Sequence, residues 1–419
     1  MDFALTRYLY PVDEVVISLI HSLIKKSSLR ICYYWAFELY YSKIHIFPIL
    51  WCIYYDFYAE LNSTLENHIQ SQYKKWSKSN GTDIKPIATI IRNFHRSIPT
   101  PNCFVMRQFI LSDKATSIQN IPAIRHCSEI NTLLTQFSSS YHIWIIAILE
   151  HDLQLIAHQT NYLVDAYGGK TVFTQLMRLL SIIFGAAPLI DIKKQHDKWD
   201  KAVNRSMQGG PMQCGPIQSG SMQGGSIQSG PMQSVSVHIL LATILVAYHT
   251  TLDNSRVKRV FIAPDQDDID WITASNIVDH IRSDKILSAK RVCDIDSDIG
   301  GFKLARDSLP ESVHTAVQNH WLYYASKNSL WHSRITSHAG YIKHTTREVN
   351  FYNENKLQEF YKLYGYEYDE QLARVQEKTP AHIDKTTIDE WVKKMFNIDL
   401  PIKAISNIQM RVSMGLHNY

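Results

Sequence analysis

Apolar residues recur at three- and four-residue spacing through the first sixty positions of the chain, which is the period of an amphipathic helix. In VDEVVISLIHSLI (12–24) the apolar residues form one stripe. Lys25 and Lys26 follow it, and cations are favoured at the C-terminus of a helix. A second helix is predicted after Ser28, because serine commonly caps helices. A third, from Ile46 to Leu61, is apolar on nearly all sides, which predicts a central position in the core.

The same period predicts further helices joined by short connections, which favours antiparallel neighbours packed as helical hairpins. Their ranges are 63–77, 83–97, 103–111, 127–138, 140–166 and 170–184, with a Gly168-Gly169 stop before the last. RVKRVFIAP (256–264) contains a strand-like core, the residues after it are predicted helical, and a final helix is expected from Thr387 to Phe396. The predicted fold is therefore mainly α, an irregular multi-helix array of antiparallel helical hairpins with minor β content near 256–264.

Six tandem pentapeptides interrupt this pattern from Ser206 to Val235, reading SMQGG PMQCG PIQSG SMQGG SIQSG PMQSV. Gly, Ser, Pro and Gln bury too little apolar surface to offset the ordering of the backbone, which predicts a flexible exposed loop. A Met/Gln-rich tether that binds a partner is the alternative interpretation. We therefore predict an N-terminal aromatic helical domain (1–112), a middle helical region (113–205), the repeat loop (206–235) and a mainly helical C-terminal region (236–419).

Composition places the 419-residue chain among globular proteins, with 45% hydrophobic and 20% charged residues. A formal net charge of +4 is too small to predict polyanion binding by itself. None of the six cysteines forms a CxxC pair, which favours reduced thiols in an intracellular protein over a disulfide framework. The N-terminus lacks a signal-peptide pattern, and the longest apolar runs, Ile44–Tyr55 and Val237–Tyr248, are too short to span a bilayer.

Carboxylates cluster at two places where they could coordinate a divalent cation. One cluster comprises Asp265, Asp267, Asp268 and Asp270, which acids at a helix N-terminus explain without a metal. The other begins at Asp294, Asp296 and Asp298 like a calcium loop, but it has Ile299 where the loop needs Gly and Ala305 where it needs Glu. The second cluster is therefore interpreted as a polar surface turn.

Histidines gather in the C-terminal region at positions 314, 320, 332, 338 and 344, but their spacings fit no zinc motif. The sequence also contains no GxxxxGK[ST] phosphate loop, GxSxG elbow or GxGxxG turn. We accordingly assign no catalytic residue, no metal ligand and no cofactor.

Basic residues flank the pentapeptide repeat and its return, where phosphate contacts with nucleic acid are one interpretation and a solvated helix face is the other. The candidate contacts are Lys193, Lys194, Lys198, Lys201, Arg205, Arg256, Lys258 and Arg259.

Two parts of the chain resemble a known group of proteins when they are taken together. DEVVISLIHSLIKKSSLRICYYWAFELYY (13–41) is an aromatic helical opening, and WLYYASKNSLWHSRITSHAGYI (321–342) precedes VNFYNENKLQEFYKLYGYEYDEQLARVQEKT (349–379). This combination resembles an uncharacterised protein family of the nucleocytoplasmic large DNA viruses, the giant viruses of protists. The resemblance implies a viral protein located in the host cytoplasm, at the virus factory, or in the virion. It implies no activity.

Residues 12–60 alone are similar to the helical collar of clamp-loader-type AAA ATPases. No ATPase domain accompanies them here, and YYDFYAEL stands where that family has its own motif. This similarity therefore implies helix-on-helix association and not ATP hydrolysis.

The leading functional expectation is a viral structural or protein-interaction protein, a scaffold or adaptor, which binds protein partners or self-associates without membrane insertion or catalysis. A DNA replication or transcription accessory protein with weak nucleic-acid binding is the first alternative. A divalent-metal-dependent enzyme that uses the 265–270 acidic cluster is the second.

Overall fold

The computed structural model describes residues 5–8, 12–62, 64–111, 128–150, 152–184, 261–277 and 320–364, together with Lys393 and Phe396. These residues are mostly helical with one small antiparallel sheet, which confirms a mainly α fold with minor β content. The chain divides into two compact units, of which unit 1 contains 1–54, 64–99 and 259–419 and unit 2 contains 55–63 and 100–258. The domain boundaries expected from the sequence stay a prediction, because 112–127 and 185–260 lie outside the described residues.

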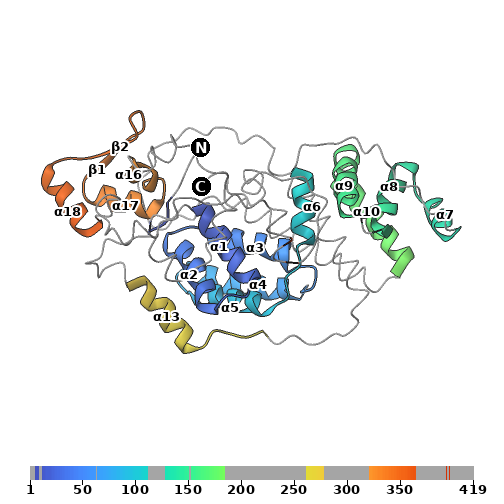
Figure 1. Cartoon of the computed structure of the whole chain (residues 1–419), viewed down its shortest axis with the longest axis horizontal. Helices are drawn as coiled ribbons and strands as arrows, with labels where there is room; N and C mark the ends of the chain where they lie inside the picture. Colours follow the sequence, from blue (N-terminus) through green and yellow to red (C-terminus); the bar gives the residue numbers. More distant parts are fainter. Residues whose placement is uncertain are drawn as a thin grey trace. The chain divides into compact units, whose positions relative to one another are not determined.

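Three helices open the chain where the apolar stripes predict them (Figure 1): α1 (Val12–Ile24), α2 (Leu29–Tyr41) and α3 (Ile46–Phe57). α1 packs against α2, and α3 is buried at Leu50 and Ile53, as its apolar surface predicts. α3 ends at Phe57 and not at Leu61, because residues 58–61 form a turn. Ser28 stands at the N-cap of α2 as expected, but its side chain makes no capping hydrogen bond.

α4 (Leu65–Lys78) and α5 (Lys85–Arg96) follow as a packed pair, and α5 also packs on α2. Pro86 lies in the first turn of α5, where its missing N–H costs no helical hydrogen bond. Ile87, Ile90, Ile91 and Phe94 recur at helical spacing and are fully buried. This stripe fixes which face of α5 is turned toward the core and which side chains remain at its edge.

Residues 5–8 are held to α2 by a buried ion pair. Arg7 Nε donates to Glu38 Oε2 at 2.9 Å, and the two side chains are 2% and 0% exposed. The Glu38 carboxylate also accepts from the backbone N–H of Tyr8 at 3.2 Å, and the Arg7 guanidinium lies over the rings of Tyr8 and Tyr41. Charge and ring contacts therefore fix the N-terminal segment to the helical array.

The C-terminal part of unit 1 forms an aromatic module (residues 320–364), which lies in the region that the sequence marks as aromatic and His-rich. It contains α16 (Trp321–Ala325), α17 (Ser329–Ser337), β1 (Gly340–Lys343), β2 (Glu348–Phe351) and α18 (Glu354–Tyr364). The strands pair antiparallel, with Gly340 opposite Phe351 and Lys343 opposite Glu348. Trp331 and Phe360 are fully buried in the core of the module. Trp331 Nε1 donates to the Thr6 carbonyl at 2.9 Å, which joins the module to the N-terminal segment.

The β content lies in this hairpin and not in the part of 256–264 that the structure describes. Residues 261–264 have no strand assignment, and 256–260 lie outside the described residues. The backbone N–H and carbonyl of Ile262 are hydrogen-bonded by a side-chain amide of α5 and not by a neighbouring strand.

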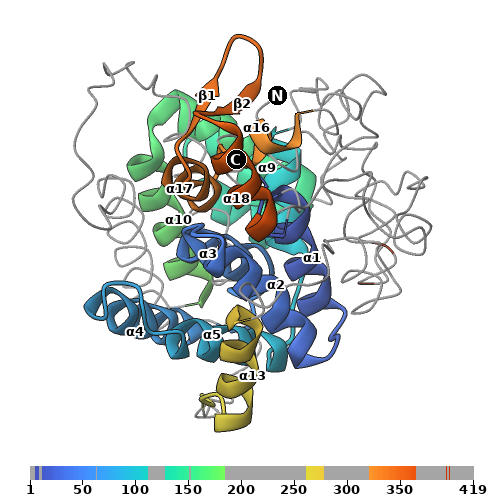
Figure 2. The same cartoon turned by 90° about the vertical axis from the view of Figure 1, so that its left-hand side faces the viewer.

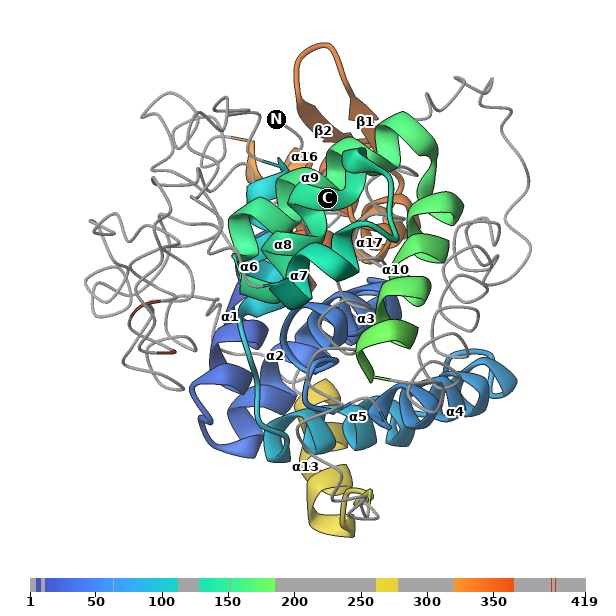
Figure 3. The ribbon, with the colours of Figure 1, turned by 90° about the vertical axis from the view of Figure 1, so that its right-hand side faces the viewer.

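Unit 2 contains a second set of helices, among them the green ribbons of Figure 3. They are α6 (Asn102–Leu111), α7 (Ser128–Leu134), η1 (Ser139–Tyr141), α8 (His142–Glu150), α9 (Leu153–Tyr167) and α10 (Gly169–Phe184). α9 packs against α6, α8 and α10. Trp144 of α8 is fully buried, and its Nε1 donates to Thr160 Oγ1 at 2.9 Å.

The single helix predicted over 140–166 is wrong, since the structure has η1, α8 and α9 there. Asp152 causes the break, because its carboxylate accepts from the backbone N–H of Leu155 at 2.9 Å and starts a new helix. Gly168 ends α9 with φ +80, which confirms the predicted stop. Of the helix predicted over 387–396, only Lys393 and Phe396 are described, both as helical.

Candidate segment-binding surface

Residues 261–277, here named the returning segment, pack onto helices of unit 1 that stand far earlier in the sequence. The segment begins with residues 261–265, which are neither helix nor strand, and continues as α13 (Gln266–Ile277). α13 packs on α2, and Figure 2 shows it beside α2 and α5. The acceptor surface is formed by side chains of α2, α4 and α5.

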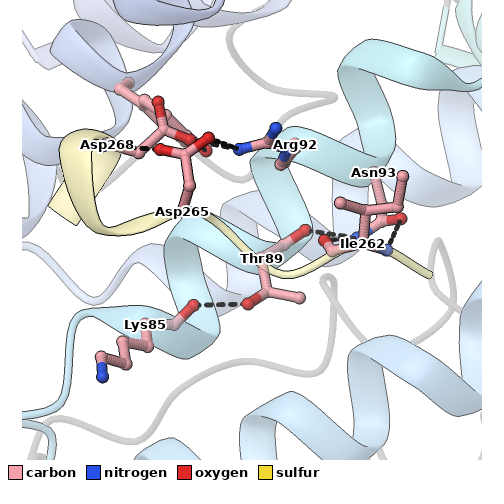
Figure 4. Close-up of polar contacts among 8 residues, drawn as sticks. Lys85, Thr89, Arg92, Asn93, Ile262, Asp265 and Asp268 are labelled. Atoms are coloured by element: carbon pink, nitrogen blue, oxygen red, sulfur yellow. Dashed lines mark hydrogen bonds and ion pairs between the residues drawn. The ribbon is translucent and has the colours of Figure 1, made fainter.

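Asn93 of α5 binds the backbone of the returning segment. Its Oδ1 accepts from the backbone N–H of Ile262 at 3.2 Å, and its Nδ2 donates to the Ile262 carbonyl at 3.0 Å (Figure 4). The same Nδ2 donates to the Thr89 carbonyl at 2.7 Å, and Asn93 is 5% exposed. A buried amide that is fixed in this way satisfies both backbone polar groups of one residue, Ile262, as a neighbouring strand would.

Arg92 forms ion pairs with two carboxylates at the start of α13. Its Nη1 contacts Asp265 Oδ2 at 3.1 Å and also binds Asp268 Oδ2 (Figure 4). The Tyr33 hydroxyl of α2 donates to Asp268 Oδ2 at 3.3 Å. Burial, and secondarily the Asp268 charge, raises the pKa of Tyr33, so this hydroxyl keeps its proton at neutral pH.

Asp265 also caps α13, because its Oδ1 accepts from the backbone N–H of Asp268 at 2.9 Å. This backbone hydrogen bond, followed by the Arg92 contact, lowers the pKa of the Asp265 carboxyl and keeps it ionised. The acidic cluster therefore serves as a helix start and as the partner of Arg92.

Ring and aliphatic contacts complete the surface. The His68 ring of α4 stacks on Phe261 with centroids 4.0 Å apart and an interplanar angle of 14°. Burial lowers the pKa of His68, and the like charge of Lys75 lowers it further, so the ring is neutral at pH 7. Ile272 of α13 is fully buried, and the Tyr41 hydroxyl donates to its carbonyl at 3.2 Å.

The surface contacts an aromatic ring, the backbone N–H and carbonyl of Ile262, two carboxylates three positions apart and a buried isoleucine. The polar and ring contacts are a ring stack, ion pairs and hydrogen bonds to the backbone. Within the described ranges, no group of three or more His, Cys, Asp or Glu side chains could hold a metal ion. The described contacts hold the returning segment against α2, α4 and α5.

The structure brings two of the candidate residues from the acidic cluster, Asp265 and Asp268, to this surface. Every residue proposed for nucleic-acid contact (Lys193, Lys194, Lys198, Lys201, Arg205, Arg256, Lys258 and Arg259) lies outside the described residues, as do Asp294, Asp296 and Asp298. His314 also lies outside them, whereas the other histidines of the cluster belong to the aromatic module.

Sequence reasoning missed Arg92, Asn93, His68 and Tyr33 as functional residues. One signal was present, since Asn93 adjoins Phe94 on the most strongly amphipathic helix and an amide on an apolar face needs a partner. The identity of the partner was not encoded nearby, because Ile262 is 169 positions away.

Comparisons of the chain with protein-family models, curated protein sequences and solved structures found no match. In the part of the chain that the structure describes, the helices are too short or too polar to cross a membrane.

Proposed function

We propose that the chain is a non-catalytic protein-interaction protein, a scaffold or adaptor, whose α2/α4/α5 surface binds short acidic segments. The observation that carries the proposal is the returning segment itself, which Asn93 binds through its backbone and Arg92 through its carboxylates. Backbone contacts supply affinity and side-chain contacts supply specificity in recognition of extended peptides. The resemblance of the sequence to the giant-virus family extends the proposal to a viral structural or adaptor protein of the virus factory or the virion.

The test uses a chain whose own segment no longer complements Arg92, made by Asp265→Lys with Asp268→Lys. A fluorescent peptide of residues 261–277 with the natural sequence is titrated into it, and anisotropy reports binding. We expect saturable binding that the added substitution Arg92→Ala weakens by about tenfold or more, because hydrogen bonds to charged groups contribute about 1.5–3 kcal/mol each.

Arg96→Ala is the matched control, since Arg96 is an exposed residue of the same helix and its replacement changes the net charge equally. A peptide carrying both Asp-to-Lys changes serves as the ligand control. Absence of saturable binding, or equal affinity for the Arg92→Ala and Arg96→Ala receptors, contradicts the proposed function.

A second candidate function, weak nucleic-acid binding, is favoured by one surface of the aromatic module. Lys343 Nζ lies 5.9 Å from the centroid of the Tyr341 ring on β1, and Lys327 Nζ lies 5.4 Å from that of Tyr323. Tyr341 is half exposed, and pairs of cations and rings suit phosphates and stacked bases.

This candidate predicts retention of single-stranded DNA at low salt that Tyr341→Ser with Lys343→Ser reduces several-fold. Filter binding across a salt series measures it, with Lys362→Ser, a lysine exposed on α18, as the control. Unchanged retention by the hairpin variant removes the candidate.

A further inference from the structure

We infer that the outer face of the β1/β2 hairpin stacks unpaired nucleotide bases, with the Tyr341 and Tyr352 rings taking one base each. The inference rests on the second candidate function and deepens it, because it names the part of a nucleic acid that the surface selects. A surface of lysines alone would bind any polyanion through its charge. The register of the hairpin, the exposure of the two rings and the charges beside them lead to this selection.

The register of the hairpin fixes which side chains share its outer face. Val349 and Phe351 of β2 pack against the core of the aromatic module, so their side of the sheet is the inner face. Side chains alternate between the two faces along a strand, and residues opposite each other share a face. Tyr341, which is paired with Asn350, therefore lies on the outer face, as does Lys343.

Tyr352 extends this outer face by one position beyond β2. Its backbone N–H donates to the Ala339 carbonyl at 3.2 Å, which continues the ladder, and the alternation puts its side chain on the face of Asn350. Tyr341 and Tyr352 are then diagonal neighbours across the strands, about 7–8 Å apart. Two aromatic rings on one face of a sheet form an arrangement on which successive unpaired bases stack.

Both rings are accessible to a ligand. Tyr352 is 83% exposed and Tyr341 is 50% exposed. In the part of the chain that the structure describes, neither ring packs against another aromatic ring. Stacking on a base would remove this apolar surface from water, and every base has a face that suits it.

The charges next to the two rings are mainly positive. Lys343 Nζ lies 5.9 Å from the centroid of the Tyr341 ring, and Arg347 is exposed in the loop between the strands. Figure 2 shows this loop extending away from α16, α17 and α18. Glu348 is the only carboxylate of positions 340–352, and its Oε2 accepts from Thr346 Oγ1 at 2.9 Å. Phosphates that join two stacked bases therefore meet a cationic border.

The test compares two single-stranded probes of about 12 nucleotides, an oligothymidylate and an abasic strand of the same length. Both probes carry the same phosphates, and only the first carries bases. Fluorescence anisotropy with the full chain at low salt measures the two affinities. We expect oligothymidylate to bind about tenfold or more tightly than the abasic strand, because stacking contributes about that factor for each base.

Variants of the outer face assign the preference to the two rings. Tyr341→Ser with Tyr352→Ser should reduce the affinity for oligothymidylate to that of the abasic strand, whereas Lys343→Ser should weaken the binding of both probes. Tyr341→Phe with Tyr352→Phe keeps the rings and should retain the preference. Tyr162→Ser is the matched control, since Tyr162 of α9 is 59% exposed in unit 2.

Three results would overturn the inference, and they differ in what they leave standing. Equal affinity of the unchanged chain for both probes, with binding that falls as salt rises, leaves nucleic-acid binding through phosphates alone. A preference for oligothymidylate that survives the loss of both tyrosines shows that the bases stack elsewhere. Absence of binding to either probe removes the second candidate function together with the inference.

Discussion

Replacement of Glu38 by Gln tests the buried ion pair that holds the N-terminal segment to α2. The substitution keeps the shape of the side chain and removes its charge, so the Arg7 guanidinium stays in a site where it is only 2% exposed. Removing one member of a buried pair destabilises a protein by about 3–5 kcal/mol, because the remaining charge lacks both water and its counter-ion. The Tyr8 and Tyr41 rings, with centroids 4.5 and 4.7 Å from the guanidinium, offset about 1–2 kcal/mol of that cost. We therefore expect a net loss of about 2–3 kcal/mol for Glu38→Gln.

The double variant Arg7→Met with Glu38→Leu separates charge from packing. Apolar residues of similar volume often replace a buried pair at little or no cost, so we expect the double variant to be more stable than Glu38→Gln. Native-state hydrogen exchange of α2 amides measures the effect within unit 1 alone, which avoids a single unfolding transition for a chain of two units. A loss below about 1 kcal/mol for Glu38→Gln refutes the reasoning, since that is how a solvated surface pair behaves.

Three further predictions concern other parts of the described structure. Gly340→Ala should destabilise the aromatic module by about 1–3 kcal/mol in thermal denaturation, because a Cβ there would lie 2.6 Å from Ile335 Cγ2; an unchanged melting temperature contradicts the packing. Burial lowers the pKa of His68, so the returning segment should bind most strongly above pH 6.5. Its binding should weaken as the pH falls below that value, because protonation of the His68 ring then opposes the buried stack on Phe261. Anisotropy of the 261–277 peptide at about pH 7.5 and about pH 5.5, on either side of the ordinary histidine pKa, measures this pH dependence. His68→Phe should remove the part of the pH dependence that comes from His68 and keep the ring stack. Burial raises the pKa of Cys32 to about 12, so iodoacetamide should label it far more slowly than the half-buried Cys52 in native protein, as read by peptide mass spectrometry; equal rates argue against the burial.

The spacing of apolar residues predicted the helices well, because the buried face of a helix repeats every three or four residues. The isoleucines of α5 and the apolar residues of α3 recur at the helical period, and these apolar faces are the ones buried in the core. The break at Asp152 escaped prediction, because the apolar period continues across it and a single capping carboxylate decides where α9 begins. The hairpin escaped too, since Arg347 takes a positive φ of 57 in its turn and no Asn-Gly or Asp-Gly pair marks the position.

The candidate site was predictable only in part. The acidic cluster was visible in the sequence, and a helix N-terminus was one of its two interpretations. Its partner Arg92 was not visible, because a lone arginine on an amphipathic helix has no distinctive pattern and the pair is separated by 173 positions. Contacts between residues so far apart in sequence depend on how the helices pack against one another, and the periodicity of the sequence does not indicate this.

The hydrogen bond between Trp331 and Thr6 also bears on the order in which the protein can fold during synthesis. Its two residues are 325 positions apart, and unit 2 lies entirely between them in sequence. At about 5–20 residues per second, the ribosome delivers Trp331 roughly 15–65 seconds after Thr6. Over that interval the helices of unit 2 leave the ribosome, whereas the N-terminal segment still lacks its last partner. Unit 1 is therefore completed only after the helices of unit 2 have been made, and a chaperone that protects residues 5–8 would have to act until the aromatic module follows.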